Sequence, residues 1–375
     1  MIRERFRQTA THYQQGSLTL GREYYTSPEI FAEESDRLFA MHWNCVGRAS
    51  RIAQPGQWFL ATVAGESLIV LRDRQGVLRA HFNVCRHRGT RLCEAASGRF
   101  SETIQCPYHA WTYGTDGRLL GAPHMQEVED FDPGTYALHS AAVAEWEGFL
   151  FVNLAPAPEA FEQAWAPMLD RLARFGIGRL RAGHQARYDI QANWKLVFEN
   201  YSECLHCPMI HPELAAVLPY KSGANDLTEG PFLGGYMEIM APHQSATMSG
   251  RACGLPVSAE LAEADRTRGY YYSLKPNLLL SIHPDYVNYY LVHPVAPDRT
   301  VVESEWLFHP ENAGRSQFNP ADAIEFWEVT NRQDWHIVER SQLGIASRRY
   351  QPGPYSPRES IPAAWDREYL RMMGR

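Results

Sequence analysis

The chain has no long apolar segment, no excess of positive charge and no regular set of paired cysteines. No apolar run approaches the roughly 18 residues that a transmembrane helix needs. The first 17 residues, MIRERFRQTATHYQQGS, lack the apolar core of a signal peptide. We therefore expect a cytoplasmic protein that does not act with a membrane. Its 375 residues are enough for two domains or one large one, each with a sizeable core.

The charge and the cysteine count exclude two further classes of protein. The 43 aspartates and glutamates outnumber the 36 lysines and arginines, which gives a net charge of −7 with neutral histidine. A negative chain is poorly suited to the phosphate backbone of nucleic acids, so we expect no nucleic-acid partner. The seven cysteines lack the spacing of a secreted disulfide framework. We expect them to be reduced or bound to metal.

Three segments of different character follow one another. Residues 1–43 carry a helix over 23–43, which Ser27 can cap and Pro28 can begin. Residues 44–155 have the pattern of short strands and turns. Residues 156–375 combine helices over 159–175, 193–206 and 320–343 with strand-like runs between them. The predicted fold class is α+β, with an all-β domain followed by a domain of helices packed on an antiparallel sheet.

The β-rich segment contains two tight pairs of cysteine and histidine. Cys85-x-His87 is followed, after 18 residues, by Cys106-x2-His109. This order is the Rieske pattern, in which two cysteines hold one iron of a [2Fe–2S] cluster and two histidines hold the other. A structural zinc site of two cysteines and two histidines would use the same residues and is the alternative.

Other residues near these pairs have expected roles as well. Tyr108, Trp111 and Tyr113 can shield a cluster from water. Cys93 lies between the pairs but outside the pattern, and we expect it to be a small buried side chain.

A second group of metal-binding residue types lies in NYSECLHCPMIHPEL, residues 200–214. His206 and His211 are five residues apart, which is awkward on a regular helix because side chains face alike at spacings of three or four. Pro208 and Pro212 can interrupt the helix and let the second histidine swing back.

The same stretch contains the pair Cys204-x2-Cys207, which could hold zinc. On a helix these two cysteines point away from His206. We therefore expect two buried thiols, with the zinc pair as the alternative.

Taken together, these motifs resemble the large subunit of the Rieske non-haem iron oxygenases. The resemblance runs through CRHRGTRLC, CPYHAWTYGTDGRL, NWKLVFENYSECLHCPMIHPEL and QDWHIVERSQLG, and covers most of the chain. It implies a Rieske domain at 44–155 and a catalytic domain of the helix-grip (START-like) kind at 156–375, on which residues 1–43 pack. It also implies the metal ligands: Cys85, His87, Cys106 and His109 for the [2Fe–2S] cluster, and His206, His211 and Asp334 for a mononuclear Fe(II).

The position of Asp334 agrees with a ligand role, since two histidines need a carboxylate to complete the facial triad of an Fe(II) oxygenase. On the predicted helix 320–343 it shares a face with Trp327, Asn331 and Val338. A carboxylate on such a partly apolar stripe is costly unless it is paired or bound to metal. Its rivals lie on other faces or nearer the helix start: Asp322, Glu325, Glu328 and Glu339.

Glu203 precedes His206 by three residues, and relatives usually have an aspartate there that joins an iron ligand to a Rieske histidine of the neighbouring subunit. The resemblance implies that Glu203 hydrogen-bonds His206 and also His109 of another chain, and so orients the iron ligand. The alternative is a solvated helix glutamate. In having glutamate at this position, the chain resembles the branch of the family that acts on quaternary ammonium compounds, such as carnitine, choline and betaines.

The resemblance implies a terminal oxygenase that takes electrons from NAD(P)H through a separate ferredoxin or flavin reductase and forms a head-to-tail homotrimer. Three hypotheses follow: oxidation of a small quaternary ammonium compound by hydroxylation or N-demethylation, oxidation of an aromatic acid by ring hydroxylation or O-demethylation, or a non-enzymatic zinc protein. Aromatic side chains at 270–308 could cage an ammonium group, although most are expected to pack a core: Tyr270, Tyr271, Tyr272, Tyr286, Tyr289, Tyr290, Trp306 and Phe308.

Overall fold

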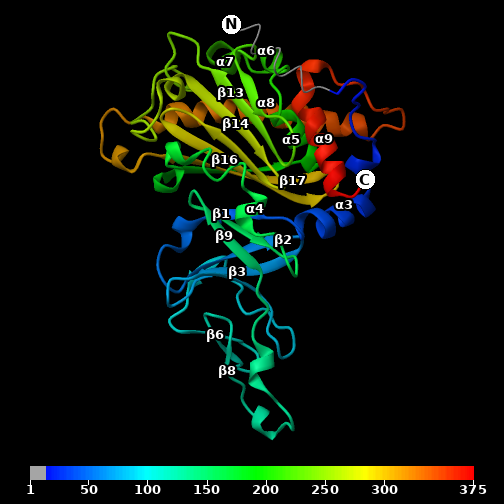
Figure 1. Cartoon of the computed structure of the whole chain (residues 1–375), viewed down its shortest axis with the longest axis vertical. Helices are drawn as coiled ribbons and strands as arrows, with labels where there is room; N and C mark the ends of the chain where they lie inside the picture. Colours follow the sequence, from blue (N-terminus) through cyan, green and yellow to red (C-terminus); the bar gives the residue numbers. More distant parts are fainter. Residues whose placement is uncertain (1–13) are drawn as a thin grey trace. The chain divides into compact units, whose positions relative to one another are not determined.

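The computed structural model describes residues 14–375, which form two compact units (Figure 1). The smaller unit comprises residues 35–166, and the larger one comprises residues 14–34 together with 167–375. The units divide close to, but not at, the predicted boundaries after residues 43 and 155. Within residues 14–375, no helix combines the length and the apolar composition needed to cross a membrane.

The predicted helix over residues 23–43 is present in three pieces. These are α2 (Glu23–Thr26), α3 (Pro28–Glu34) and a π-helical turn (Ser35–Phe39). The Ser27 hydroxyl accepts the N–H of Ile30 at 3.2 Å, as expected of a cap, and Pro28 begins α3.

The smaller unit is built from antiparallel sheets, as predicted. The first sheet is β1 (Asn44–Arg48), β10 (Phe149–Asn153) and β9 (Ala142–Trp146), in that order. The second is β4 (Leu78–Phe82), β3 (Glu66–Arg72), β2 (Gln57–Val63) and β5 (Ser97–Arg99), and the third is β6 (Thr103–Gln105), β7 (Thr112–Gly114) and β8 (Leu119–Gly121). Glycines with positive φ lie in the two hairpin turns between β2, β3 and β4, Gly65 with φ of 79° and Gly76 with φ of 78°.

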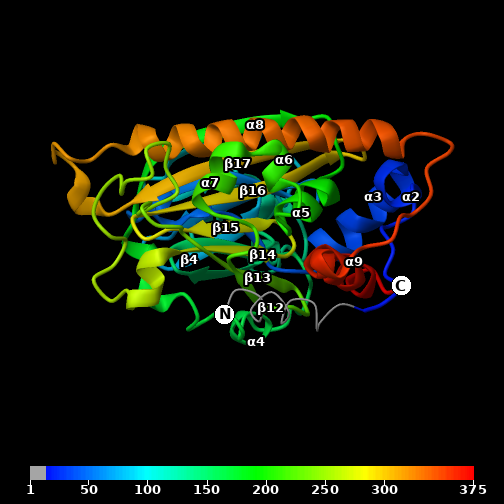
Figure 2. The same cartoon turned by 90° about the horizontal axis from the view of Figure 1, so that it is seen from above.

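The larger unit packs helices on one antiparallel sheet of seven strands, and α8 lies along that sheet (Figure 2). The strand order is β11 (Arg181–Ile190), β17 (Arg299–Phe308), β16 (Tyr286–Ala296), β15 (Leu278–Ile282), β14 (Arg268–Leu274), β13 (Phe232–Glu238) and β12 (Ala224–Leu227). Every residue of β15 is buried, so this strand is covered on both faces, and its sequence, apolar apart from Ser281, does not alternate.

The helices of the larger unit are α5 (Trp194–Tyr201), α6 (Cys207–Ile210), α7 (Pro212–Val217), α8 (Pro320–Ile345) and α9 (Ser360–Met372). Short 3-10 helices connect the elements: Ala49–Ile52, Met125–Glu127, Pro133–Tyr136, Ala173–Phe175, Ile177–Arg179, Glu263–Thr267, Pro310–Asn312 and Pro357–Glu359. The Asn193 side chain caps α5 by accepting the N–H of Lys195 at 3.0 Å. Helix α8 begins at Pro320 as predicted and ends one residue after Gly344.

The predicted helix over residues 159–175 is wrong along most of its length. Only α4 (Phe161–Ala164) is α-helical, and a 3-10 turn follows at Ala173–Phe175. Pro167 has no N–H to continue the helical ladder. Trp165, Met168 and Leu172 nevertheless lie at helical spacing and are buried, so the periodic pattern reflects burial in the core and not a continuous helix.

A buried ion pair joins α3 to α5 in the larger unit. Lys195 Nζ lies 2.5 Å from Glu34 Oε1, and both side chains are almost wholly buried. The Glu34 carboxylate also accepts the N–H of Trp194 at 2.8 Å and the O–H of Tyr369 at 2.6 Å. These hydrogen bonds offset the cost of taking both charges out of water.

Replacing Glu34 would leave the Lys195 charge buried without its partner. We expect Glu34→Ala to lower the free energy of unfolding by about 3–5 kcal/mol, measured by urea denaturation. Glu33→Ala is the matched control, because Glu33 pairs with Arg375 at a partly exposed site, where an ion pair contributes about 0–1 kcal/mol. Equal losses in the two variants would contradict a structural role for the buried pair.

Candidate functional site

Two loops of the smaller unit carry the first predicted ligand set, and their backbones are hydrogen-bonded alike. In each loop the N–H of the cysteine, Cys85 or Cys106, donates at 2.8 Å to the carbonyl five residues later. The N–H four residues later donates back to the cysteine carbonyl, and that fourth residue has a positive φ, 79° at Gly89 and 56° at Ala110. The repeated loop geometry presents one cysteine and one histidine from each loop.

The four predicted side chains converge. The rings of His87 and His109 lie 4.8 Å apart between centroids. Burial raises the pKa of the Cys85 thiol, and its hydrogen bond with Cys106 raises it further. His87 Nδ1 is buried and has no hydrogen-bond partner among the described residues, as a nitrogen reserved for a metal would be. Two sulfurs and two imidazoles fit a Rieske cluster, and they would equally fit zinc.

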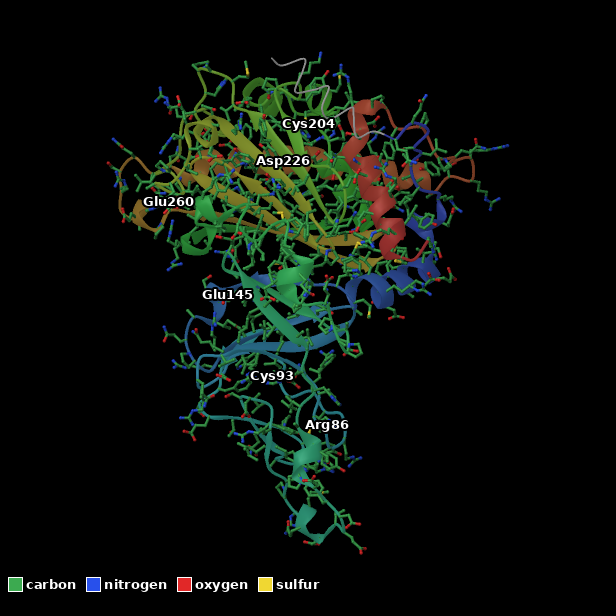
Figure 3. The ribbon with its side chains drawn as sticks, viewed as in Figure 1. Arg86, Cys93, Glu145, Cys204, Asp226 and Glu260 are labelled. Atoms are coloured by element: carbon green, nitrogen blue, oxygen red, sulfur yellow. A yellow bond between two sulfur atoms is a disulfide. The ribbon has the colours of Figure 1, made fainter. Side chains whose placement is uncertain are left out.

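Aromatic side chains pack against this ligand set. Trp111 stacks on His87 at 4.8 Å, and the Tyr113 hydroxyl lies 3.3 Å from Cys85 Sγ; both aromatic side chains are buried. Tyr108 is itself 57% exposed, but its ring lies against that of His109, with 3.7 Å between the centroids, so it covers part of this histidine. Cys93, labelled in Figure 3, lies in the smaller unit and is buried, as expected.

In the larger unit, His206 and His211 lie on either side of the short helix α6. Pro208 occupies the first turn of α6, and Pro212 begins α7. Between the two helices His211 has φ −122° and ψ 71°, which is not helical. The chain therefore turns at His211, and the two imidazole rings approach to 5.2 Å between centroids.

Asp334 of α8 meets both histidines. Its Oδ1 lies 2.9 Å from His211 Nε2 and 3.4 Å from His206 Nε2. Donor atoms about 2.1 Å from a shared metal lie about 3.0 Å apart at right angles and about 3.4 Å apart at tetrahedral angles. The two distances in the structure fall close to this range, so two imidazole nitrogens and one carboxylate oxygen fit a mononuclear iron site.

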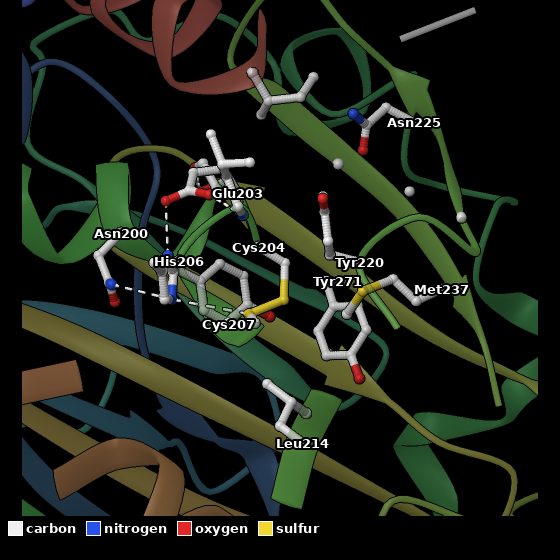
Figure 4. Close-up of a pocket in the computed structure, with 18 of the residues that line it drawn as sticks. Asn200, Glu203, Cys204, His206, Cys207, Leu214, Tyr220, Asn225, Met237 and Tyr271 are labelled. Atoms are coloured by element: carbon white, nitrogen blue, oxygen red, sulfur yellow. Dashed lines mark hydrogen bonds and ion pairs between the residues drawn. A yellow bond between two sulfur atoms is a disulfide. The ribbon is translucent and has the colours of Figure 1, made fainter. Parts of the chain in front are cut away.

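Each histidine also contacts a side-chain oxygen through its other ring nitrogen. His206 Nδ1 lies 2.6 Å from Glu203 Oε1 (Figure 4), and His211 Nδ1 lies 2.7 Å from Gln333 Oε1. An Nδ1–H that donates to such an oxygen leaves Nε2 free to bind a metal and holds the ring in place. Sequence reasoning identified Glu203 but missed Gln333, whose only signal was its position beside Asp334.

The carboxylates of Asp334 and Glu203 determine the charge of His206, which contacts both of them. Burial alone would raise the pKa of Asp334, but hydrogen bonds from His206 and His211 lower it to about 2. Burial alone would lower the pKa of His206, but hydrogen bonds to Asp334 and Glu203 raise it to about 10. The group therefore favours a positive charge between His206 and the carboxylates, which is where a metal cation would lie.

The rivals of Asp334 on α8 are engaged elsewhere or face solvent. Glu328 Oε1 accepts a hydrogen bond from the Tyr188 hydroxyl at 2.7 Å, and Glu339 Oε1 accepts one from the backbone N–H of Gln191 at 3.0 Å. Asp322 accepts the N–H of Ser249 at 3.0 Å, and Glu325 is exposed.

The expectation of two buried thiols at Cys204 and Cys207 is wrong, because their sulfurs are joined in a disulfide (Figure 4). Helix α5 ends at Tyr201, so Cys204 lies in the segment between α5 and α6 and Cys207 begins α6, with their Cα atoms 5.0 Å apart. Cys207 Sγ is 3.9 Å from His206 Nε2. A zinc pair is not what the structure contains either, since both sulfurs are used in the disulfide.

A cavity of about 150 Å³ opens beside the predicted triad. Tyr271, Trp327 and the disulfide form parts of its wall. Gly234 and Gly235 of β13 form another part, where a Cβ would lie only 2.0–2.1 Å from a carbonyl oxygen of the adjacent strand. Of the eight aromatic residues expected at 270–308, only Tyr271 lines the cavity, and the other seven are 5% exposed or less.

Comparison with known proteins assigns this arrangement to a family. Residues 42–132 match the Rieske [2Fe-2S] domain, and residues 177–375 match the ring hydroxylating alpha subunit (catalytic domain). The glycine betaine monooxygenase oxygenase subunit of Chromohalobacter salexigens is 34% identical, with 91% of this chain and 82% of that protein covered. The carnitine monooxygenase oxygenase subunit of Acinetobacter baumannii is 30% identical, with 89% and 86% covered.

Solved structures agree with these matches. The quaternary ammonium Rieske monooxygenase CntA in complex with L-carnitine is 27% identical, with a TM-score of 0.79 and 96% of each chain covered. Naphthalene 1,2-dioxygenase from Rhodococcus shares the fold at 20% identity and a TM-score of 0.79. The chain therefore belongs to the alpha subunits of the Rieske non-haem iron oxygenases, O2-using oxidoreductases with a Rieske [2Fe–2S] domain and an iron-dependent catalytic domain.

Proposed function

We propose that this chain is the terminal oxygenase of a two-component system that hydroxylates or N-demethylates a small quaternary ammonium compound. An oxygenase subunit works with a separate reductase, and we propose that this partner passes electrons from NAD(P)H to the Rieske cluster. The choice of substrate rests on two relatives, the oxygenase subunits of glycine betaine monooxygenase and carnitine monooxygenase. Each is at least 30% identical to this chain over most of its length.

The cavity is chemically suited to a cationic substrate. The rings of Tyr271 and Trp327 both line it and lie 6.2 Å apart between centroids. The face of an aromatic ring attracts a desolvated quaternary ammonium by roughly 0.5–2 kcal/mol. Glu203 and Asp334, which carry carboxylates, line the same cavity and make it more favourable for a cation.

In this proposal His206, His211 and Asp334 hold the mononuclear iron. When bound, that iron would supply the activation of O2, and the cluster held by Cys85, His87, Cys106 and His109 would supply the electrons. Glu203 and Gln333 keep the two imidazoles in the orientation that leaves both Nε2 atoms toward Asp334. Tyr271 and Trp327 position the substrate and exclude water.

The proposal includes an assembly that follows from the sequence resemblance alone. The chains would form a head-to-tail homotrimer in which Glu203 also receives a hydrogen bond from His109 of a neighbouring subunit. Each complete active site would then need two chains.

A substrate screen tests the proposed function directly. We expect glycine betaine and carnitine, given NADH, a ferredoxin or flavin reductase and O2, to cause substrate-dependent oxygen consumption, with formaldehyde released where a methyl group is lost. Aromatic acids should give only the background rate. Turnover of aromatic acids without turnover of any quaternary ammonium compound would replace this substrate class with the aromatic one.

Asp334→Ala tests the assignment of the iron ligands. Loss of one of three ligands should release the mononuclear iron, so the iron content should fall from about three to about two per chain while the cluster absorption stays. Glu325→Ala is the control, since Glu325 is exposed on the same helix. An unchanged iron content in Asp334→Ala would refute its role as a ligand.

Glu203→Gln tests the role of the Glu203 charge. Glutamine can still accept the His206 hydrogen bond, so both metals should remain bound. Turnover should fall by about 10–100-fold, because this is the usual effect of altering a carboxylate that hydrogen-bonds a metal-binding histidine. Glu213→Gln, at an exposed position on α7, serves as the control and should leave turnover unchanged. Unchanged turnover in Glu203→Gln would show that the negative charge of Glu203 is not required.

A further inference from the structure

The disulfide between Cys204 and Cys207 encloses the candidate metal ligand His206. Both cysteines line the cavity, and Figure 4 shows the disulfide beside the His206 ring. Cys207 Sγ lies 3.9 Å from His206 Nε2, the nitrogen that also faces Asp334. A sulfur atom therefore stands next to the candidate iron site.

This sulfur belongs to a second possible donor set. The ligand atoms of His206, Cys207 and His211 all lie within 4.8 Å of one another. In a tetrahedral zinc site, sulfur at 2.3 Å and nitrogen at about 2.05 Å from the metal lie about 3.6 Å apart. The 3.9 Å separation of Cys207 Sγ from His206 Nε2 needs only a small movement to reach this geometry.

The disulfide decides whether Cys207 can act as a ligand, since the thiolate is the form of cysteine that binds metals. With the disulfide intact, the available donors are two imidazoles and the Asp334 carboxylate, the set typical of Fe(II) oxygenases. With the disulfide reduced, a soft sulfur donor joins the two imidazoles, and such a set favours zinc.

We propose that Cys204 and Cys207 form a dithiol–disulfide couple that controls which metal the catalytic site holds. The oxidised pair leaves the site to iron, and the reduced pair creates a zinc site from His206, Cys207 and His211. The inference rests on the proposed iron site at the same two histidines and adds a metal site and its control.

The two sulfurs differ in access, which sets the course of the reduction. Cys204 is partly exposed at the cavity, whereas Cys207 is 2% exposed and packs in an apolar cluster with Leu214 and Val217. A dithiol reductant attacks Cys204, a mixed disulfide forms there, and Cys207 leaves as the thiolate beside His206. The second thiol of the reductant then releases Cys204, so one dithiol becomes a disulfide as two cysteines are freed. Hydrogen peroxide reverses the change, since two thiols and one peroxide give a disulfide and two water molecules.

The experiment measures metal exchange in the resting holoprotein. Protein loaded with iron is incubated anaerobically with excess zinc, with or without a phosphine reductant, which carries no thiol to compete for zinc. Bound metals are then determined by mass spectrometry after desalting, and the state of each cysteine by differential alkylation. We expect roughly tenfold more zinc, replacing the mononuclear iron, in the reduced protein than in the oxidised one.

Three variants separate the roles of the cysteines. Cys204→Ser leaves Cys207 permanently free, so it should take up zinc without any reductant. Cys207→Ser should keep its iron even with the reductant. Cys253→Ala is the matched control, a buried cysteine of the same apolar cluster outside the donor set, and should behave like the unchanged protein.

Equal zinc uptake by the unchanged protein with and without the reductant would overturn the inference. So would zinc uptake by Cys207→Ser equal to that of the unchanged protein when both are treated with the reductant. Failure of the proposed iron site would instead appear as an unchanged iron content in Asp334→Ala. Because the metal is measured without substrate, the result does not depend on which compound the enzyme oxidises.

Discussion

The larger unit depends on one contact between distant parts of the chain, the 2.9 Å hydrogen bond between His211 and Asp334. The two residues are 123 positions apart in the sequence. One lies at a break between two short helices, and the other lies within a helix of 26 residues. Because these polar groups meet in apolar surroundings, each is tolerable only with its partners in place. The break between α6 and α7 at Pro212 positions His211, and the packing of α8 along the sheet positions Asp334, so that the two side chains come into contact.

The residues that could be recognised from the sequence are those whose chemistry is unusual for their position. Cysteine–histidine pairs on loops, two histidines separated by a proline, and Asp334 on a partly apolar helix face all stand out in that way. An antiparallel sheet in the second domain was also foreseeable, because the sequences of β15, β16 and β17 are rich in apolar residues and separated by turns. The polar sequences of β11 and β12 do not carry this signal. Gln333 was not foreseeable, since glutamine is common on helices and its contact with His211 depends on how α8 is rotated.

The errors of the sequence analysis arise where tertiary packing decides the local structure. The C-x2-C pair was placed on a helix, but α5 ends at Tyr201 and the following turn brings the two cysteines together. The aromatic residues of β14–β17 were candidates for a cavity wall, yet strands covered on both faces give no sign of which face meets a cavity. Ala110 in the smaller unit is a further example. It has a positive φ, like Gly89 at the matching position of the other loop, but an alanine gives no sign of this conformation in the sequence.

The glycines of β13 constrain how this enzyme can evolve. At Gly234 and Gly235 bare backbone of β13 closes one side of the cavity, and the adjacent strands stand too near for any side chain. A boundary of this kind cannot be moved by a single substitution, because every larger residue would push the strands apart. Natural variation in substrate size must therefore act on the side chains that complete the enclosure, such as Leu214, Tyr220 and Met237. The β13 side of the cavity therefore stays constant, and changes in cavity size are confined to the side chains on its other sides.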